Sequence, residues 1–285
     1  MNDAVDAARP GRTVECGIER IEGTTQKHDF DRVVTEEPLE LRLVAGGRAQ
    51  TLAVTMRTPG NDFELAAGFA MSEGIIRARG DLAGVSYCID PEVDAEQRYN
   101  IVNIDLTAPT LPDMSRFERH FTMNSSCGVC GRANLDALRD AGVAAVDDDV
   151  RVQADVIYAL PDRMREAQRV FAVTGGLHAA ALFLPDGTLL ALREDIGRHN
   201  AVDKLVGYAT LDGRFPLHGT LLAVSGRASF EILQKAAVAR IPIVAAVSAP
   251  SSLAVDLARG FNITLVAFVR GARANIYSVP ERVTV

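Results

Sequence analysis

Apolar and polar residues alternate along two neighbouring stretches early in the chain, residues 39–44 and 51–56, which Gly46 and Gly47 separate. The apolar positions are Leu39, Leu41, Leu43, Leu52, Val54 and Met56. A period of two is typical of strands with one buried face, and paired glycines favour a tight turn. The pattern therefore predicts a hairpin.

A helix is expected after this hairpin, with Asn61 as its cap and Glu64 completing a capping box. Its apolar residues recur at helical spacing until Gly74 weakens the pattern. Two further strands are predicted at 85–89 and 101–106. This β-β-α-β-β order is that of a small α+β roll of the β-grasp kind.

The second half of the chain alternates between helical and strand patterns. Helices are expected at 135–141, 154–170, 230–239 and 252–259, a hairpin at 180–184 and 189–193, and apolar runs at 221–224, 241–247 and 263–269. These runs are short and flanked by helices, which is typical of buried parallel strands. The pattern predicts a three-layer α/β domain.

The domain organisation follows from this change of pattern. Residues 1–15 mix small, acidic, glycine and proline residues without a period, so we expect a disordered tail. The α+β roll is then assigned to 16–124 and the α/β domain to 125–285.

Charge and composition exclude several classes of protein. The 285 residues include 37 acidic and 30 basic side chains, and the net charge of -7 offers no basic field for nucleic acid. The first residues lack the apolar segment of a secretory signal, and no run of about 18 apolar residues could cross a membrane. We expect a cytoplasmic protein that binds neither nucleic acid nor membrane.

Small residues follow each of the three predicted parallel strands. They are Ser225-Gly226-Arg227, Ser248 through Ser252, and Arg270-Gly271. Ligands of α/β sheets bind at the carboxyl ends of strands, where helix N-termini favour phosphate. Ordinary turn and cap chemistry explains any one loop equally simply, but three loops at one edge favour a ligand site.

The densest chemical signal is the pair Cys127 and Cys130 in C-G-V-C-G, followed by a predicted helix. A helix N-terminus stabilises a thiolate, which is the reactive form for sulfur transfer. Gly128 and Gly131 permit an exposed loop. The other two cysteines, Cys16 and Cys88, have no matching partner and receive no role.

Other interpretations of the cysteine pair are less well supported. A zinc site needs four ligands, and no second pair with suitable spacing exists. A thioredoxin-like motif would follow the first strand of a βαβ unit, which is missing here. A purely structural pair is disfavoured because the flanking glycines and serines make a poor core.

His178, in T-G-G-L-H-A-A, invites comparison with zinc deaminases, whose signature is H-x-E followed by P-C-x-x-C. Ala180 stands where the essential glutamate would be, and the cysteine pair precedes the histidine. Deamination is therefore unsupported, and His178 is either a structural histidine or part of a pocket wall.

A polar stretch, R-E-D-I-G-R-H-N-A-V-D-K over residues 193–204, stands where a strand gives way to a helix. Solvated ion pairing explains Asp203 and Lys204. It explains less well four charged or titratable residues within seven positions, namely Arg193, Asp195, Arg198 and His199. We interpret this stretch as the wall of a site.

Five ordered motifs together resemble the formate dehydrogenase accessory sulfurtransferases, the FdhD family. They are R-T-P-G-N-D-F-E-L-A-A-G-F (57–69), C-G-V-C-G (127–131), T-G-G-L-H-A-A (174–180), the stretch 193–204, and S-G-R-A-S-F-E (225–231). The resemblance covers nearly the whole chain. It implies a C-terminal domain similar to cytidine deaminases.

The resemblance also implies a function. Cys127 would accept persulfide sulfur from a cysteine desulfurase, assisted by Cys130, and pass it to Mo-bis(molybdopterin guanine dinucleotide) before insertion into the formate dehydrogenase catalytic subunit. That cofactor would be bound transiently by the stretch Phe268, Val269, Arg270, Gly271, Ala272 and Arg273. No resident metal is implied, and a homodimer is expected.

Two alternatives belong to other classes. A chaperone could bind the molybdenum cofactor without covalent sulfur transfer, in which case Arg270 and Arg273 would matter and the cysteines would not. A zinc-dependent hydrolase on a deaminase scaffold would require stoichiometric metal.

Overall fold

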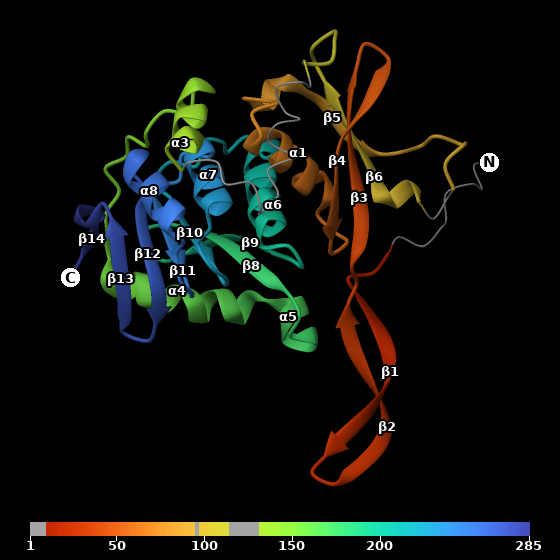
Figure 1. Ribbon diagram of the computed structural model, residues 1–285, viewed down its shortest axis with the longest axis horizontal. Helices are drawn as coiled ribbons and strands as arrows, with labels where there is room; N and C mark the ends of the chain where they lie inside the picture. The colour runs from red at the N-terminus through yellow and green to blue at the C-terminus, as the bar shows by residue number, and fades with distance from the viewer. Residues whose placement is uncertain (1–9, 95–96, 114–130) are drawn as a thin grey trace.

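The computed structural model describes residues 10–94, 97–113 and 131–285 and comprises a small four-stranded sheet, a larger six-stranded sheet with helices on both faces, and a projecting hairpin (Figure 1). No helix within these described ranges is long and apolar enough to span a membrane.

The small sheet has the strand order β4-β3-β6-β5, with β3 and β6 parallel at its centre. Its elements are β3 (Glu37–Ala45), β4 (Arg48–Arg57), α1 (Asp62–Ser72), β5 (Leu82–Tyr87) and β6 (Ile101–Leu106). Leu39, Leu41 and Leu43 are fully buried on the face that α1 covers. The predicted hairpin and β-β-α-β-β order are confirmed.

Helix α1 has Asn61 as its N-cap residue, as predicted, but the expected capping box does not form. Asn61 has a left-handed backbone, with φ 60°, and makes no side-chain cap hydrogen bond. Its Oδ1 accepts from Arg12 at 2.6 Å. Glu64, the other half of the expected capping box, binds Arg193 in the α/β half of the molecule. A tertiary ion pair therefore replaces the local cap.

The large sheet has the order β13-β12-β11-β10-β8-β9. Its strands are β8 (His178–Phe183), β9 (Leu189–Asp195), β10 (Leu221–Val224), β11 (Ile243–Ala246), β12 (Thr264–Arg270) and β13 (Arg273–Ser278). As predicted, β10, β11 and β12 are parallel. The neighbours β8 and β13 run antiparallel to them, and the sequence pattern had given no sign of β13.

Helices cover both faces of this sheet. Those packed against one face are α6 (Arg198–Leu211), α7 (Phe230–Val238) and α8 (Ser252–Gly260), and α4 (Ala154–Ala167) lies on the other. Successive strand residues divide between the faces: Leu222 packs with the first set of helices, and Leu221 packs with α4. The three-layer arrangement is confirmed, while its likeness to cytidine deaminases stays a prediction.

Shorter elements complete the chain. They are α3 (Gly131–Asp140), α5 (Arg169–Thr174), the paired β7 (Val152–Gln153) and β14 (Val283–Thr284), and the 3-10 turns Arg79–Asp81, Arg98–Asn100 and Pro280–Arg282. The single helix expected over 154–170 is thus two helices, α4 and α5.

The projecting hairpin, which we call the arm, consists of β1 (Thr13–Glu22) and β2 (Thr25–Val34). Its strands pair over ten residue pairs. The disordered tail predicted for residues 1–15 is wrong for residues 13–15, because Thr13 already pairs with Val34, and residues 1–9 lie outside the described residues. The sequence pattern did not predict the arm, because charged residues occupy both of its faces.

One continuous core extends from the small sheet into the α/β half. Leu41 and Leu65 belong to the same buried cluster as Leu205 and Val206 of α6. The main bridge is the pairing of α1 with α6. The predicted domain boundary at residues 124 and 125 lies outside the described residues.

Candidate strand-end site

The loops after the parallel strands meet at one edge of the large sheet. Ser248 donates its backbone N–H to the carbonyl of Gly226 at 3.4 Å, and Phe268 donates to the carbonyl of Ser248 at 3.2 Å. His178 starts the antiparallel β8 at the same edge, and the Ser225 hydroxyl oxygen accepts from Ala179 N at 2.9 Å. We call His178, Ser225, Gly226, Ser248 and Phe268 the strand-end ledge.

His178 is half-buried within the ledge. Burial lowers the pKa of His178 below its usual 6.5, and the positive charges of Arg198 and His199 lower it further. A Cβ on Gly226 would lie 3.4 Å from His178 Nδ1, so the glycine lets the imidazole approach the backbone. The lowered pKa favours a neutral imidazole, which can both donate and accept a hydrogen bond.

His199, the second residue of α6, contacts the start of α7. Its Nε2 lies 3.3 Å from Ser229 Oγ and 3.4 Å from Glu231 Oε2. The hydrogen bond from His199 lowers the pKa of Glu231 to about 2, against some opposition from burial. The Glu231 carboxylate therefore stays ionised opposite the imidazole down to low pH.

Arg198, which begins α6, carries an orphaned donor. Its Nε is buried and has no hydrogen-bond partner among the described residues. An unsatisfied buried donor costs about 1–3 kcal/mol, so an acceptor bound there would recover that cost. Arg198 thus gives this end of the ledge a positive charge suited to an anion.

The residues of the polar stretch 193–204 have different surroundings in the structure, and several of them form buried or half-buried ion pairs. Arg193 pairs with Glu64 of α1, and Asp195 pairs with Lys204 at 2.6 Å. Asp203 binds Lys235 at 2.8 Å. The first pair joins α1 to β9, whereas the other two lie within the α/β half. The interpretation of Arg193 and Asp195 as site wall stays a prediction. The solvated pairing expected for Lys204 and Asp203 is wrong, because both are 1% exposed. Arg198 and His199 remain at the ledge.

A buried arginine next to this network was missed by sequence reasoning. Arg57 is fully buried and donates to Asp62 at 3.2 Å and to the carbonyl of Tyr99 at 3.1 Å. The adjacent Thr58 N donates to Asp195 Oδ2 at 3.2 Å. The sequence feature that could have revealed this arginine is the R-T-P-G-N-D motif, in which a strand ends on arginine before a Pro-Gly turn. The Thr58 contact joins the end of β4 to β9, while Arg57 ties β4 to α1 and to the turn before β6.

The predicted cofactor stretch forms the end of β12 and the turn into β13. Val269 is buried, whereas Phe268 is 43% exposed and adopts φ 55° beside Ser248. Arg270 and Arg273 face each other across the turn and are exposed. The stretch therefore adjoins the ledge, and its binding role stays a prediction.

Cys127 and Cys130 lie outside the described residues. The helix predicted after them is confirmed as α3, which begins at Gly131. Across the described ranges no three His, Cys, Asp or Glu side chains could hold a metal ion together.

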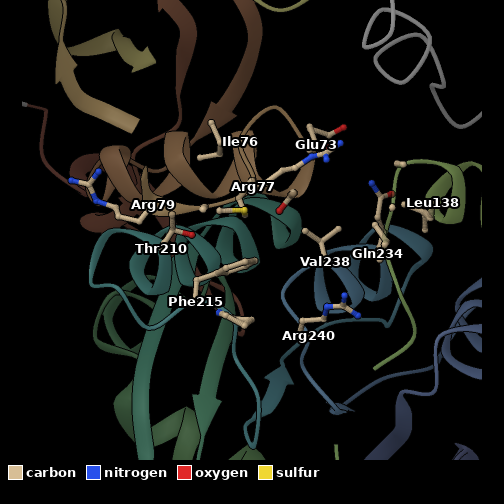
Figure 2. A pocket seen from close by; sticks show the side chains of 18 of the residues that line it. Glu73, Ile76, Arg77, Arg79, Leu138, Thr210, Phe215, Gln234, Val238 and Arg240 are labelled. Carbon is tan, nitrogen blue, oxygen red and sulfur yellow. The ribbon is translucent and has the colours of Figure 1, made fainter. Parts of the chain in front are cut away.

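A cleft of about 680 Å³ lies where α1, α3, α6 and α7 end (Figure 2). Because α6 and α7 begin at the ledge, the cleft is at the other end of these helices. Apolar side chains such as Leu138, Phe215 and Val238 line it, with Arg77 and Arg240 at its margin. Since Leu138 belongs to α3, this cleft adjoins the helix that follows the cysteine pair.

The fold and the ledge define an α/β protein whose strand-end edge brings together backbone groups, two histidines and an arginine. Residues 34–284 match the model of the FdhD/NarQ family, and the chain belongs to this family.

Individual relatives agree with this assignment. The chain is 54% identical over 257 residues to "Sulfur carrier protein FdhD" of Streptomyces avermitilis, covering 89% of each chain. It is 45% identical to the protein of the same description in Sulfurisphaera tokodaii, covering 93% of this chain and 96% of that one. The family resemblance inferred from the five motifs is confirmed.

A crystal structure from Desulfotalea psychrophila, described as that of a candidate formate dehydrogenase accessory protein, shares the fold. Its TM-score is 0.73 at 23% identity, and the match covers 96% of this chain and 100% of that one.

Proposed function

We propose that this chain is a sulfur carrier for formate dehydrogenase maturation. Cys127 accepts a persulfide sulfur from a cysteine desulfurase and transfers it to Mo-bis(molybdopterin guanine dinucleotide), which then enters the formate dehydrogenase catalytic subunit. The observation that carries the proposal is membership of the FdhD/NarQ family, together with the intact C-G-V-C-G motif at 127–131. Relatives with closely similar sequences are described as sulfur carriers.

The chemistry assigned to Cys127 requires a thiolate. The thiolate attacks the terminal sulfur of the donor persulfide, and the donor cysteine leaves as its own thiolate. The start of α3 at Gly131, four residues after Cys127, supports this assignment, because the positive end of a helix favours a nearby thiolate. Cys130 is assigned a supporting part in the same transfer.

The strand-end ledge is where we place the nucleotide portions of the cofactor, which here is substrate. The fit rests on three observations. Arg198 Nε is a buried donor without a partner in the described chain. Gly226 leaves backbone accessible beside His178, and Arg270 and Arg273 stand exposed at the adjoining turn. Arginine forks and backbone N–H groups bind phosphate and guanine well.

Intact-protein mass spectrometry tests the covalent step. The protein is incubated with a cysteine desulfurase and cysteine, and wild type is compared with Cys127→Ala and Cys130→Ala. We expect a reductant-labile gain of one sulfur atom in wild type that is lost with Cys127→Ala. A wild-type protein that gains no sulfur would contradict the carrier.

The second candidate, a cofactor chaperone without covalent transfer, is favoured by the same ledge. Binding of guanosine monophosphate, measured by calorimetry, separates the two. Arg198→Gln should weaken that binding about tenfold or more, a loss of about 1.4 kcal/mol, while Arg48→Gln at a distant hairpin should not. Nucleotide binding combined with no sulfur gain would favour the chaperone.

A further inference from the structure

The cleft at the far end of α6 and α7 from the strand-end ledge takes no part in the proposed nucleotide binding. Its volume is about 680 Å³ (Figure 2). Its walls come from both halves of the molecule, since residues 71–79 belong to the small-sheet half and the ends of α3, α6 and α7 belong to the α/β half. Sites for small ligands measure about 300–1,000 Å³ and occur preferentially where two parts of a fold meet. The cleft therefore has the size and the position of a ligand site.

The base of the cleft is apolar. Met71 and Ile76, from the small-sheet half, are 2% and 1% exposed, and Leu138 of α3 is 8% exposed. Phe215 and Val238 are half-buried and border the same space (Figure 2). We call these five residues the floor. Transfer of a ligand's apolar body from water onto such a surface is favourable.

Basic side chains border the floor. Arg77 and Arg79 come from the small-sheet half, and His218 and Arg240 come from the α/β half, whereas Glu73 is the only acid among the described residues that line the cleft. Arg77 and Arg240 stand on opposite sides of it (Figure 2). The chain as a whole has a net charge of -7, so a local excess of basic groups is unlike the rest of the molecule. This margin is complementary in charge to an anion.

Arg77 and Arg240 are positioned by contacts that leave their charges available. Asp81 fixes the exposed loop of Arg77 by accepting a hydrogen bond from its backbone N–H at 2.7 Å. Arg240 donates from Nη1 to the carbonyl oxygens of Ala144 and Ala145, at 2.6 Å and 3.1 Å. A carbonyl oxygen does not neutralise a guanidinium, so Arg240 keeps its charge, and its other N–H groups can bind an anion.

The helix ends at the cleft oppose this positive charge, because a helix C-terminus carries a partial negative charge of about one half. Backbone donors already bind the last carbonyls of these helices. Gly74 donates to the carbonyl of Met71 at 3.0 Å after α1, and Arg240 donates to that of Ala237 at 3.1 Å after α7. A guanidinium, in contrast, binds an anion by direct, charge-assisted hydrogen bonds. The arginines therefore decide the sign of the ligand.

We propose that the cleft binds one small organic anion, whose apolar body lies on the floor and whose carboxylate or phosphate group binds Arg77 and Arg240. The volume of about 680 Å³ suits a single small molecule. The half-buried Gln234 adds an amide to the lining, which supplies a further polar contact. This inference is independent of the proposed sulfur chemistry, because the ledge lies at the other end of α6 and α7.

Two fluorescent probes test the site. The first, 8-anilinonaphthalene-1-sulfonate, has an anionic group on an apolar body, and the second, N-phenyl-1-naphthylamine, has the same body without the charge. We expect one sulfonate probe to bind per chain. Arg77→Gln should weaken its binding about three- to tenfold, while binding of the neutral probe should stay within about twofold, because the floor is unchanged.

The matched control is Arg32→Gln, because Arg32 is an exposed arginine of β2, outside the cleft. This variant should bind both probes as wild type does. A sulfonate affinity that Arg77→Gln leaves unchanged, or equal weakening of both probes by that variant, would overturn the proposal.

Hydrogen exchange on the unmodified protein gives a second test, which does not depend on a variant. The sulfonate probe should slow exchange at residues 137–143, 213–218 and 234–240, which include cleft-lining positions from α3, α6 and α7. Protection confined to the ledge at 225–229, or displacement of the probe by guanosine monophosphate, would place the anion at the ledge and refute the cleft as its site.

Discussion

Gly68 of α1 and Gly207 of α6 face each other where the two helices cross, close enough for their backbones to touch. A Cβ added to Gly68 would collide with the carbonyl oxygen of Asp203, and one added to Gly207 with that of Glu64. The crossing joins the small sheet to the α/β half of the molecule. Glycine is therefore required at both positions by the helix contact, although both lie in helix interiors, where it is otherwise unfavourable.

Replacing Gly207 by alanine should destabilise the protein. Alanine would gain about 1 kcal/mol of helix propensity, but the new methyl group must push two backbones apart. We expect the free energy of unfolding to fall by about 1–3 kcal/mol or more. Urea denaturation followed by circular dichroism measures this directly.

Gly80→Ala is the matched control, because a Cβ there meets no atom within 4 Å. Its effect should stay within about 0.5 kcal/mol. Equal stability of the two variants would mean that α1 and α6 are farther apart in solution than in the structure.

The ion pair between Lys204 and Asp195 is buried on both sides, at 1% and 0% exposure. Burial lowers the pKa of Lys204, and the neighbouring Asp195 opposes that shift. Lys204→Met would leave the Asp195 carboxylate buried without its counter-charge. We expect a loss of about 3–5 kcal/mol in the free energy of unfolding.

The control for this prediction is Lys27→Met, which removes the exposed pair with Glu22. That change should cost at most about 1 kcal/mol. Similar losses from the two variants, in the same denaturation experiment, would show that the Lys204 pair is not buried in solution.

The sequence predicted the fold well where periodicity is strong. The alternation of Leu39, Leu41 and Leu43 and the apolar run at 221–224 follow directly from burial on one or both faces of a sheet. The arm was missed although β1 begins with a short alternation, in which Val14, Cys16 and Ile18 lie on one face. The alternation ends at Arg20, and β2 carries no matching stripe, since Asp31 and Asp29 stand opposite Cys16 and Ile18.

The site was predicted only in part. Serine and glycine after each parallel strand located the ledge, because strand topology alone brings those loops together. The partners of Arg193 and Lys204 were not predictable, since Glu64 and Thr58 lie more than a hundred positions earlier in the chain. Charge density along the sequence therefore gave no sign that Arg193 binds across to α1.

Acid denaturation should report the contact between His199 and Glu231. The pKa of Glu231 is lowered from its usual 4.5 to about 2 by the hydrogen bond from His199. A lowered carboxylate pKa contributes stability above the unfolded value, and this contribution is lost as the pH falls from about 4.5 towards 2. Because Glu231 is 52% exposed, solvent screening makes the effect small.

Glu231→Gln and His199→Gln should flatten the decline in unfolding free energy over this pH window by similar amounts, as measured by urea denaturation at several pH values. Either variant declining as steeply as wild type would mean that the two side chains do not interact in solution.

The titration of His178, followed by NMR of its ring carbons, tests the electrostatics of the ledge. Burial, with Arg198 and His199, lowers the pKa of His178 below 6.5, so its midpoint should lie below that of a free histidine. Arg198→Gln removes one of the positive charges and should raise the midpoint.

An anion bound near Arg198 should also raise the midpoint of His178. Adding guanosine monophosphate to wild type should therefore raise the midpoint, and the same addition should have less effect in Arg198→Gln. A midpoint at or above 6.5 that neither change moves would place His178 in solvent and remove it from the ledge.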